Sequence, residues 1–386
     1  MGSVGGVFLL FSAILIWTSP NFAMANIRVT DFFEDQLHQD LTKVTWAHAV
    51  NSQDKLNEAL NSDVMMLEAD ILMGTKEGSD KKVPIMAHPP NNISDLLFED
   101  FLKKVIKANE NSKKGIKLDF KDIGAVTPVM KLIEKNRRRK ALSFPIWVNA
   151  DIWVGPVNAT TQPLDPEAFL ALTSKDVRIQ PTLSIGWTTR FGTEKDQTIS
   201  KGQYTNANRI EALRFLDTAG IDGNIREVTF PVRAGIAAQS ADVLLDLVNR
   251  AGNKATLTLW SKEDDPVDMD QLEHMVTLIG RERIYADLPF SLPGSDASAI
   301  STHKGKDKKD VTIATTKRPT TSITTATTTK STDSRKIKDD KNIKDHLVIV
   351  EDKLDPNSTV HVNSGEATAS LWVVVVTSLL FIFCTY

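Results

Sequence analysis

Short apolar runs alternate with amphipathic segments between residues 26 and 293. Eight of these runs have the length and β-branched content of strands that are buried on both faces. They occupy residues 43–50, 64–73, 115–120, 145–152, 178–187, 227–232, 255–260 and 283–288. Helical patterns separate most of the runs, for example at 96–108, 210–220 and 241–252. The alternation predicts a parallel sheet with helices between its strands.

Eight strand–helix units in one domain of this size predict a (β/α)8 barrel, the TIM-barrel architecture. An open doubly wound sheet is the alternative, but no glycine-rich phosphate-binding turn follows the first strand. A further apolar segment at 83–88 follows the turn sequence at 74–80. It predicts a short hairpin strand that returns alongside the second strand.

The two ends of the chain carry longer apolar blocks. Residues 7–17 precede the small-residue sequence at 23–25, so we expect a signal peptide at 1–25, with an uncleaved anchor as the alternative. A second block at 371–383 is followed by only three residues, none of them basic. The tail at 369–386 therefore favours a glycolipid-anchor signal over a transmembrane helix. Both interpretations predict the extracellular face of the plasma membrane, with release as a secreted protein as a further possibility.

The segment between the predicted domain and the tail is polar. Residues 294–368 are rich in threonine around 311–333 and predict a disordered, O-glycosylated stalk. N-x-S/T sequences at Asn92, Asn158 and Asn357 are candidate N-glycosylation sites. The single cysteine, Cys384, lies in the tail, so the domain at 26–293 has no disulfide and depends on its core. A net charge of −3 gives no indication of a nucleic-acid partner.

Polar side chains occur near the carboxyl ends of the predicted strands, where TIM barrels carry their catalytic groups. The candidates are His48 and Asn51, Glu68 and Asp70, His88, Asp119 and Lys121, Asn149 and Asp151, and Trp260. We expect Asn51, Asn149, Asp151 and Trp260 to contact a substrate at the barrel mouth.

Glu68 and Asp70 are two residues apart on a strand, so their carboxylates project from the same face. Like charges at that range need compensation, and a hard divalent cation with oxygen ligands supplies it. Asp119 on the next strand completes a site for one Mg²⁺ or Ca²⁺. The set does not fit structural zinc, which prefers Cys and His. Alternatively, each acid is a salt-bridged or exposed strand-end residue.

His48 and His88 are expected at the ends of two neighbouring elements. An imidazole can hold or release a proton near neutral pH, so the pair suits a general acid and a general base beside the metal. The alternative is that both are structural histidines.

Five motifs together carry a resemblance to a known family: WAHAVNS (46–52), LEADI (67–71), PIMAHPP (84–90), KLDFKD (117–122) and WVNADI (147–152). The chain is identified by them as a member of the menorin family. Through it, the chain resembles the phospholipase-C-like and glycerophosphodiester phosphodiesterases, including the sphingomyelinase-D-like branch. The resemblance covers most of residues 41–290.

The resemblance implies catalytic roles for His48, His88 and Lys121, metal ligation by Glu68, Asp70 and Asp119, and a lipid or head-group phosphodiester as substrate. Two departures affect the phosphate site. The first histidine is followed by Ala-Val rather than Arg-Gly, and the second by Pro rather than Asp. The missing arginine removes a bidentate phosphate contact that Lys121 would have to replace.

Two functions follow from these observations. The first is a metal-dependent phosphodiesterase with histidine acid–base catalysis. The second is a non-catalytic ligand that keeps the barrel and binds a cell-surface receptor, because the resemblance also implies extracellular roles in cell contact and neurite patterning.

Overall fold

The computed structural model describes residues 27–292, with gaps at 140, 175–179 and 195–196. The predicted signal peptide, stalk and tail, together with Asn357, lie outside the described residues. Within the described ranges, no helix combines the length and the apolar character needed to cross a bilayer.

Eight parallel strands form the centre of the domain, as the sequence predicts. Their neighbours follow the order β1-β2-β5-β6-β7-β10-β11-β12. They are β1 (Trp46–Ala47), β2 (Met66–Lys76), β5 (Gly115–Phe120), β6 (Ile146–Val154), β7 (Thr182–Thr188), β10 (Val228–Arg233), β11 (Ala255–Trp260) and β12 (Ile284–Asp287). This strand order, with helices between successive strands, is that of a (β/α)8 barrel of the TIM type.

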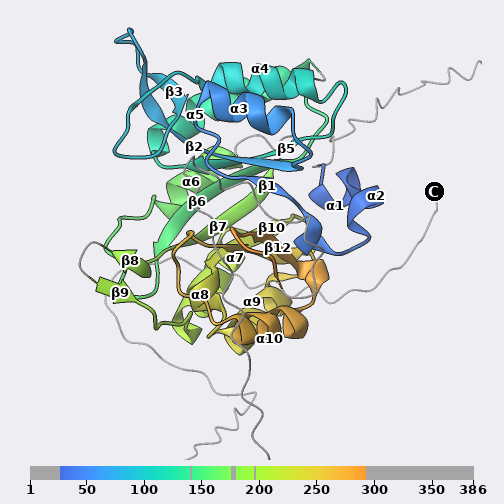
Figure 1. The fold of residues 1–386 in the computed structure, drawn as a ribbon, viewed down its shortest axis with the longest axis vertical. Helices are drawn as coiled ribbons and strands as arrows, with labels where there is room; N and C mark the ends of the chain where they lie inside the picture. Colours follow the sequence, from blue (N-terminus) through green and yellow to red (C-terminus); the bar gives the residue numbers. More distant parts are fainter. Residues whose placement is uncertain (1–26, 140, 175–179, 195–196, 293–386) are drawn as a thin grey trace, which may run out of the picture. The chain divides into compact units, whose positions relative to one another are not determined.

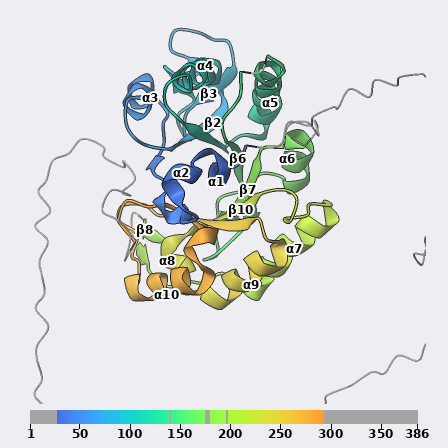
Figure 2. The same ribbon diagram turned by 90° about the vertical axis from the view of Figure 1, so that its right-hand side faces the viewer.

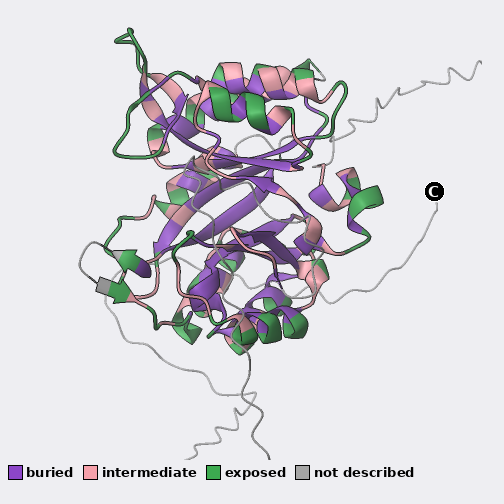
Figure 3. Ribbon diagram, in the orientation of Figure 1, coloured by how far each residue is buried: buried purple, intermediate pink, exposed green. Residues whose placement is uncertain are grey.

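Helices lie around these strands (Figures 1 and 2). They are α3 (Gln53–Leu60), α4 (Phe98–Ala108), α5 (Ile123–Arg138), α6 (Pro166–Thr173), α7 (Asn206–Thr218), α8 (Ala234–Ala237), α9 (Ala241–Ala251) and α10 (Met269–Ile279). Apart from α8, which is buried along its whole length, the helices expose their outer faces, whereas the strands are almost entirely buried (Figure 3). The outward side chains of the strands, such as Leu67 and Leu118, pack with the helices in the main hydrophobic core. The inward side chains form a separate, largely polar interior.

The amino-terminal end of the barrel is closed by an apolar plug. The short helices α1 (Val29–Phe32) and α2 (Glu34–Leu37) and the 3-10 turn η1 (Leu41–Lys43) precede β1. Their apolar residues pack on Trp46, Trp147 and Tyr285, which are fully buried. Figure 2 shows α1 and α2 in front of the strands. Access to the polar interior is therefore expected from the opposite end, where the strands finish.

The predicted hairpin strand at 83–88 is confirmed as β3 (Val83–Met86), antiparallel to β2. Several other elements were not predicted. The small strand β4 (Ile93–Ser94), the hairpin of β8 (Gly192–Glu194) and β9 (Gln197–Ile199), the plug helices and the 3-10 turn η2 (Arg281–Arg283) carry too few residues for a periodic signal. The first strand is also shorter than expected, because the chain turns immediately after Ala47.

Candidate active site

His48 lies in a tight turn directly after β1. The turn places Ala49 at φ 53°, a left-handed conformation that is rare for residues other than glycine. It is held by the carboxylate of Glu68, whose Oε2 accepts a hydrogen bond from the Ala49 amide at 2.7 Å. Ser52 then caps α3 by accepting from the Lys55 amide at 3.3 Å. The two contacts fix His48 at the carboxyl end of the strand.

The ring of His48 is oriented by an acid from the last strand of the barrel. Its Nδ1 lies 2.8 Å from Oδ2 of Asp287 and 3.5 Å from Oε2 of Glu68. The Asp287 side chain is completely buried, whereas that of His48 is 35% exposed. Burial would lower the pKa of His48, but the two neighbouring carboxylates raise it to about 10. The contact with Asp287 therefore engages Nδ1, one of the two ring nitrogens of His48.

Three carboxylates gather beside this histidine. Glu68, Asp70 and Asp119 each offer an oxygen, and these oxygens lie within 4.8 Å of one another. Asp70 and Asp119 are register partners on β2 and β5, and Glu68 points inward from the same face of β2. Burial raises the pKa of Glu68; His48 opposes this shift, and Asp70 adds to it. The sequence-based expectation that these three acids come together agrees with the geometry.

Asn51 and Lys121 hold Asp70 in place. The Asn51 amide donates to Oδ2 of Asp70 at 2.7 Å, and its carbonyl oxygen accepts from the Asp70 backbone at 3.0 Å. The Lys121 ammonium lies 2.6 Å from Oδ2 of Asp119 and 3.3 Å from Oδ1 of Asp70. Burial alone would lower the pKa of Lys121, but Asp119 and Asp70 raise it well above its usual range. Both residues reach the cluster as expected from the sequence, although Asn51 binds an acid rather than an open site.

Asn149 and Asp151 extend the polar network along β6. Asn149 donates to Oδ1 of Asp119 at 2.8 Å and accepts from the Ser184 hydroxyl at 2.5 Å, so it positions a predicted metal ligand. Asp151 lies two residues further toward the mouth. Burial raises its pKa, Lys121 opposes the shift and Asp119 adds to it, giving a value of about 7.

The carboxylate cluster fits a hard divalent cation. Its donors are oxygen atoms from three closely spaced acids, which Mg²⁺ and Ca²⁺ accept. The wider site holds five carboxylates (Glu68, Asp70, Asp119, Asp151 and Asp287) and three basic groups (His48, Lys117 and Lys121). With every group ionised, two negative charges remain, which one divalent cation would balance.

His88 lies at the same rim but apart from the cluster. The Ala87 amide donates to the Asp70 carbonyl oxygen at 3.0 Å, which places the following residue beside the end of β2. The His88 ring is exposed, and its Nδ1 donates to the Pro89 carbonyl oxygen at 2.7 Å. Among the residues that the structure describes, no contact between His88 and the three acids is recorded. The predicted pairing of the two histidines stays a prediction.

Trp260 forms part of the opposite wall of the mouth. It is partly exposed at the end of β11, and the Arg233 guanidinium lies 5.1 Å from its ring centre. Arg233 forms two hydrogen bonds with Asp265, at 2.7 and 2.6 Å, and both side chains are almost completely buried. This pair ties the loop after β11 to the end of β10, so it holds the tryptophan in a fixed position.

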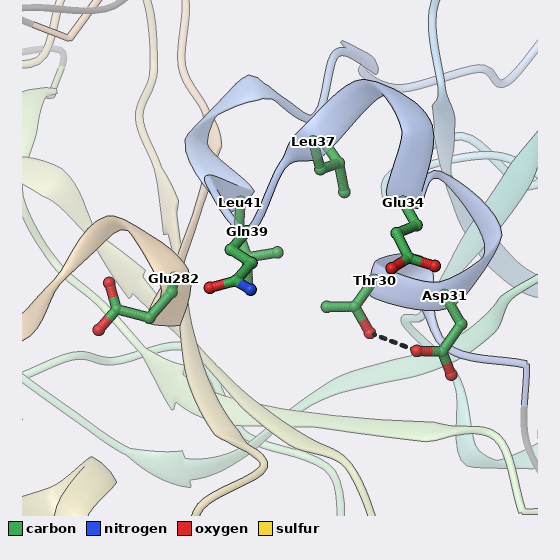
Figure 4. Close-up of a pocket in the computed structure, with 7 residues that line it drawn as sticks. All are labelled: Thr30, Asp31, Glu34, Leu37, Gln39, Leu41 and Glu282. Atoms are coloured by element: carbon green, nitrogen blue, oxygen red, sulfur yellow. Dashed lines mark hydrogen bonds between the residues drawn. The ribbon is translucent and has the colours of Figure 1, made fainter.

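A surface hollow lies away from these groups, beside the plug (Figure 4). It is formed by elements that precede β1 and β12, at the amino-terminal side of the strands. Its lining residues are Thr30, Asp31, Glu34, Leu37, Gln39, Leu41 and Glu282. None of them belongs to the predicted site. The strand-end cluster carries the chemistry of the domain better, since it combines acids, a histidine and a lysine.

Residues 40–293 match the family model described as the Menorin N-terminal domain. The chain is 36% identical over 251 residues to Protein FAM151B of Homo sapiens. This alignment covers 65% of the chain and 84% of Protein FAM151B. The chain belongs to the menorin family. A solved structure of 2,3-dimethylmalate lyase, described as a PEP mutase/isocitrate lyase superfamily member, aligns with 67% of this menorin chain and 79% of its own at 13% identity and a TM-score of 0.34. The strand order of the menorin domain is that of a (β/α)8 barrel.

Two residues of the site were missed in the sequence. Asp287 ends the eighth strand and meets the strand-end criterion that selected the other candidates, so the same rule applied to RIYADL would have found it. Lys117 interrupts an apolar strand two residues before Asp119, and a lysine in a doubly buried strand is itself a signal.

Of the predicted glycosylation sites, Asn92 and Asn158 are exposed. Their modification stays a prediction.

Proposed function

We propose that the menorin domain is a divalent-cation-dependent phosphodiesterase that acts on a lipid or head-group phosphodiester at the extracellular face of the plasma membrane. The supporting observation is the contact of His48 with Asp287 at 2.8 Å beside the cluster of Glu68, Asp70 and Asp119. A histidine oriented by a buried acid beside a site that fits a divalent cation suits acid–base catalysis of phosphodiester cleavage.

Each side chain has a defined task in this proposal. A bound cation would balance the charge of the phosphate. His48 is cationic at neutral pH and gives a proton from Nε2 to the leaving oxygen as its bond to phosphorus breaks. Asp287 holds the ring and stabilises its charge. His88, at the same rim, takes the proton of the attacking hydroxyl or water. Lys121 binds a phosphate oxygen in place of the absent arginine.

A second candidate is a cell-surface ligand without catalytic activity, which binds a receptor through its outer loops. One contact favours it. The Lys121 ammonium bridges Asp119 and Asp70, so the protein itself already supplies part of the charge that a metal would supply. A barrel compensated in this way can keep its fold without turning over a substrate.

Turnover of a phosphodiester panel by the purified protein decides between the two candidates. We expect His48→Asn to lower kcat by about 10²-fold or more, the usual contribution of a positioned acid. His274→Asn, at an exposed position on α10, is the matched control and should keep full activity. If the folded wild-type protein binds a divalent cation but turns over none of the substrates, the result favours the non-catalytic cell-surface ligand.

Metal binding is measured separately by thermal denaturation. Titration with Mg²⁺ or Ca²⁺ should raise the Tm of the wild type, since a ligand that binds only the native state stabilises it. Asp70→Asn should lose most of this rise in Tm. The substitution removes one of the three carboxylate ligands and leaves only Glu68 and Asp119 to bind the cation. An equal rise in both proteins would place the ion elsewhere.

A further inference from the structure

Lys117 is a buried lysine in the barrel that the proposed chemistry does not use. It lies on β5 two residues before Asp119, so both side chains project into the interior. The residue is 4% exposed, and its Nζ lies 5.9 Å from the centre of the Trp46 ring. Within the described part of the chain, its ammonium forms no hydrogen bond and has no carboxylate oxygen within 4.0 Å.

An ammonium ion without a directly paired acid is expensive to bury. In this barrel the compensating field comes from several acids at once. Glu68 is the register partner of Lys117 on β2, and Asp119 follows it on the same strand. The charge of Lys117 acts to lower the pKa of Glu68, Asp119 and Asp151, so it interacts with the cluster as a whole.

We propose that Lys117 is an internal counter-ion that competes with a divalent cation for the field of the Glu68, Asp70 and Asp119 cluster, and so weakens cation binding. The inference rests on the metal site of the proposed function. It assigns this chain a site that fills at the millimolar cation concentrations typical of extracellular calcium sites, rather than at micromolar concentrations.

Lys117 differs in this respect from Lys121. The Lys121 ammonium touches Asp70 and Asp119 directly, but its side chain is 23% exposed and lies at the mouth. It can turn outward when a cation enters. Lys117 lies one inward position before Asp119 on β5, against the Trp46 ring, and only 4% of the residue is exposed. Its positive charge therefore remains beside the bound cation and repels it.

Calorimetric titration of the full-length protein with Ca²⁺ tests the inference. Lys117→Met removes the charge with little change in length, and Lys117→Gln removes it with a side chain that keeps hydrogen-bonding groups. We expect the Kd for Ca²⁺ to fall by about 10-fold or more in either variant, because a nearby unit charge acts strongly in a buried site. Lys117→Arg keeps the charge and should retain the wild-type Kd within about 3-fold.

Lys114 offers a matched control at the other end of the strand. It is as deeply buried as Lys117, but its ammonium donates to the Val64 carbonyl oxygen at 2.7 Å and also to that of Ser62. Lys114→Met should reduce stability, since it leaves these carbonyls without their donor, and should leave the Kd for Ca²⁺ unchanged. Circular dichroism and Tm of each variant separate loss of fold from a change in affinity.

The Ca²⁺ titration and the activity assay can fail independently of each other. A folded Lys117→Met or Lys117→Gln protein with equal or weaker Ca²⁺ binding overturns the inference, as does a wild-type Kd below about 10⁻⁶ M. Binding by these variants alone, with none by the wild type, supports it and removes the metal dependence from the proposed function. A shifted Kd without turnover of any phosphodiester supports the inference while the proposed function fails.

Discussion

His48 and Asp287 are 239 residues apart in the chain, yet their side chains meet at 2.8 Å between the ends of the first and last barrel strands. β1 and β12 are the two ends of the strand order and are not paired with each other in it. The His48–Asp287 contact is one of the side-chain contacts that join these two ends, together with the packing of Trp46 against Tyr285.

Replacement of Asp287 by asparagine should change the histidine without changing the fold. The substitution keeps the shape but removes the larger of the two carboxylate charges, those of Asp287 and Glu68, that raise the pKa of His48 to about 10. We expect that pKa to fall toward the ordinary histidine value of about 6.5, measured by NMR titration of the ring protons. Turnover should fall by about 10²-fold. Asp270→Asn, on the exposed side of α10, is the control, and an unchanged His48 titration in Asp287→Asn would contradict the assignment.

Asp151 gives the metal-free protein a specific pH dependence. Its folded pKa of about 7 lies above the unfolded value of 3.8, so it favours folding below pH 3.8 and this contribution is lost as the pH rises through 7. Asp151→Asn should therefore raise the free energy of unfolding by about 1 kcal/mol at pH 8, a magnitude reduced for partial exposure. Little change is expected near pH 4. Denaturation by urea at both pH values measures the difference, and a variant that is equally or less stable at pH 8 would refute the prediction.

The Arg233 and Asp265 pair should be a major local contribution to stability. Arg233→Met leaves the carboxylate of Asp265 buried without its charged partner, which costs about 3 kcal/mol or more in the free energy of unfolding. Arg250→Met removes an exposed ion pair with Asp246 and should cost less than about 0.5 kcal/mol. Chemical denaturation compares the two. Similar losses would show that burial of the first pair has no energetic consequence.

Replacement of the tail at 369–386 by a glycolipid is tested on intact cells. Treatment with a phosphatidylinositol-specific phospholipase should release the protein into the medium, because that enzyme cleaves the glycolipid expected to hold it. A protein with the tail exchanged for a known transmembrane helix is the control and should remain bound. Retention of the natural chain, together with a cytoplasmic C-terminus, would identify a membrane-spanning helix instead.

The local pattern of the chain was sufficient for the barrel and for the cluster of Glu68, Asp70 and Asp119. Strand positions follow from apolar runs, and parallel strands place their carboxyl ends at one rim, so the sequence alone groups Glu68, Asp70 and Asp119. These inferences need only the period of a strand and the direction of its neighbours. They say nothing about which oxygen faces which donor.

Tertiary structure decided the contacts that give each group its properties. The approach of Asp287 to His48 depends on barrel closure, which joins residues from the two ends of the domain. Asn51 was expected to meet a substrate but is bound to Asp70, because the turn after β1 directs it across the neighbouring strand. The field around Lys117 comes from acids on several strands. Electrostatic energy depends on distance and burial, and neither can be calculated from spacing along the sequence.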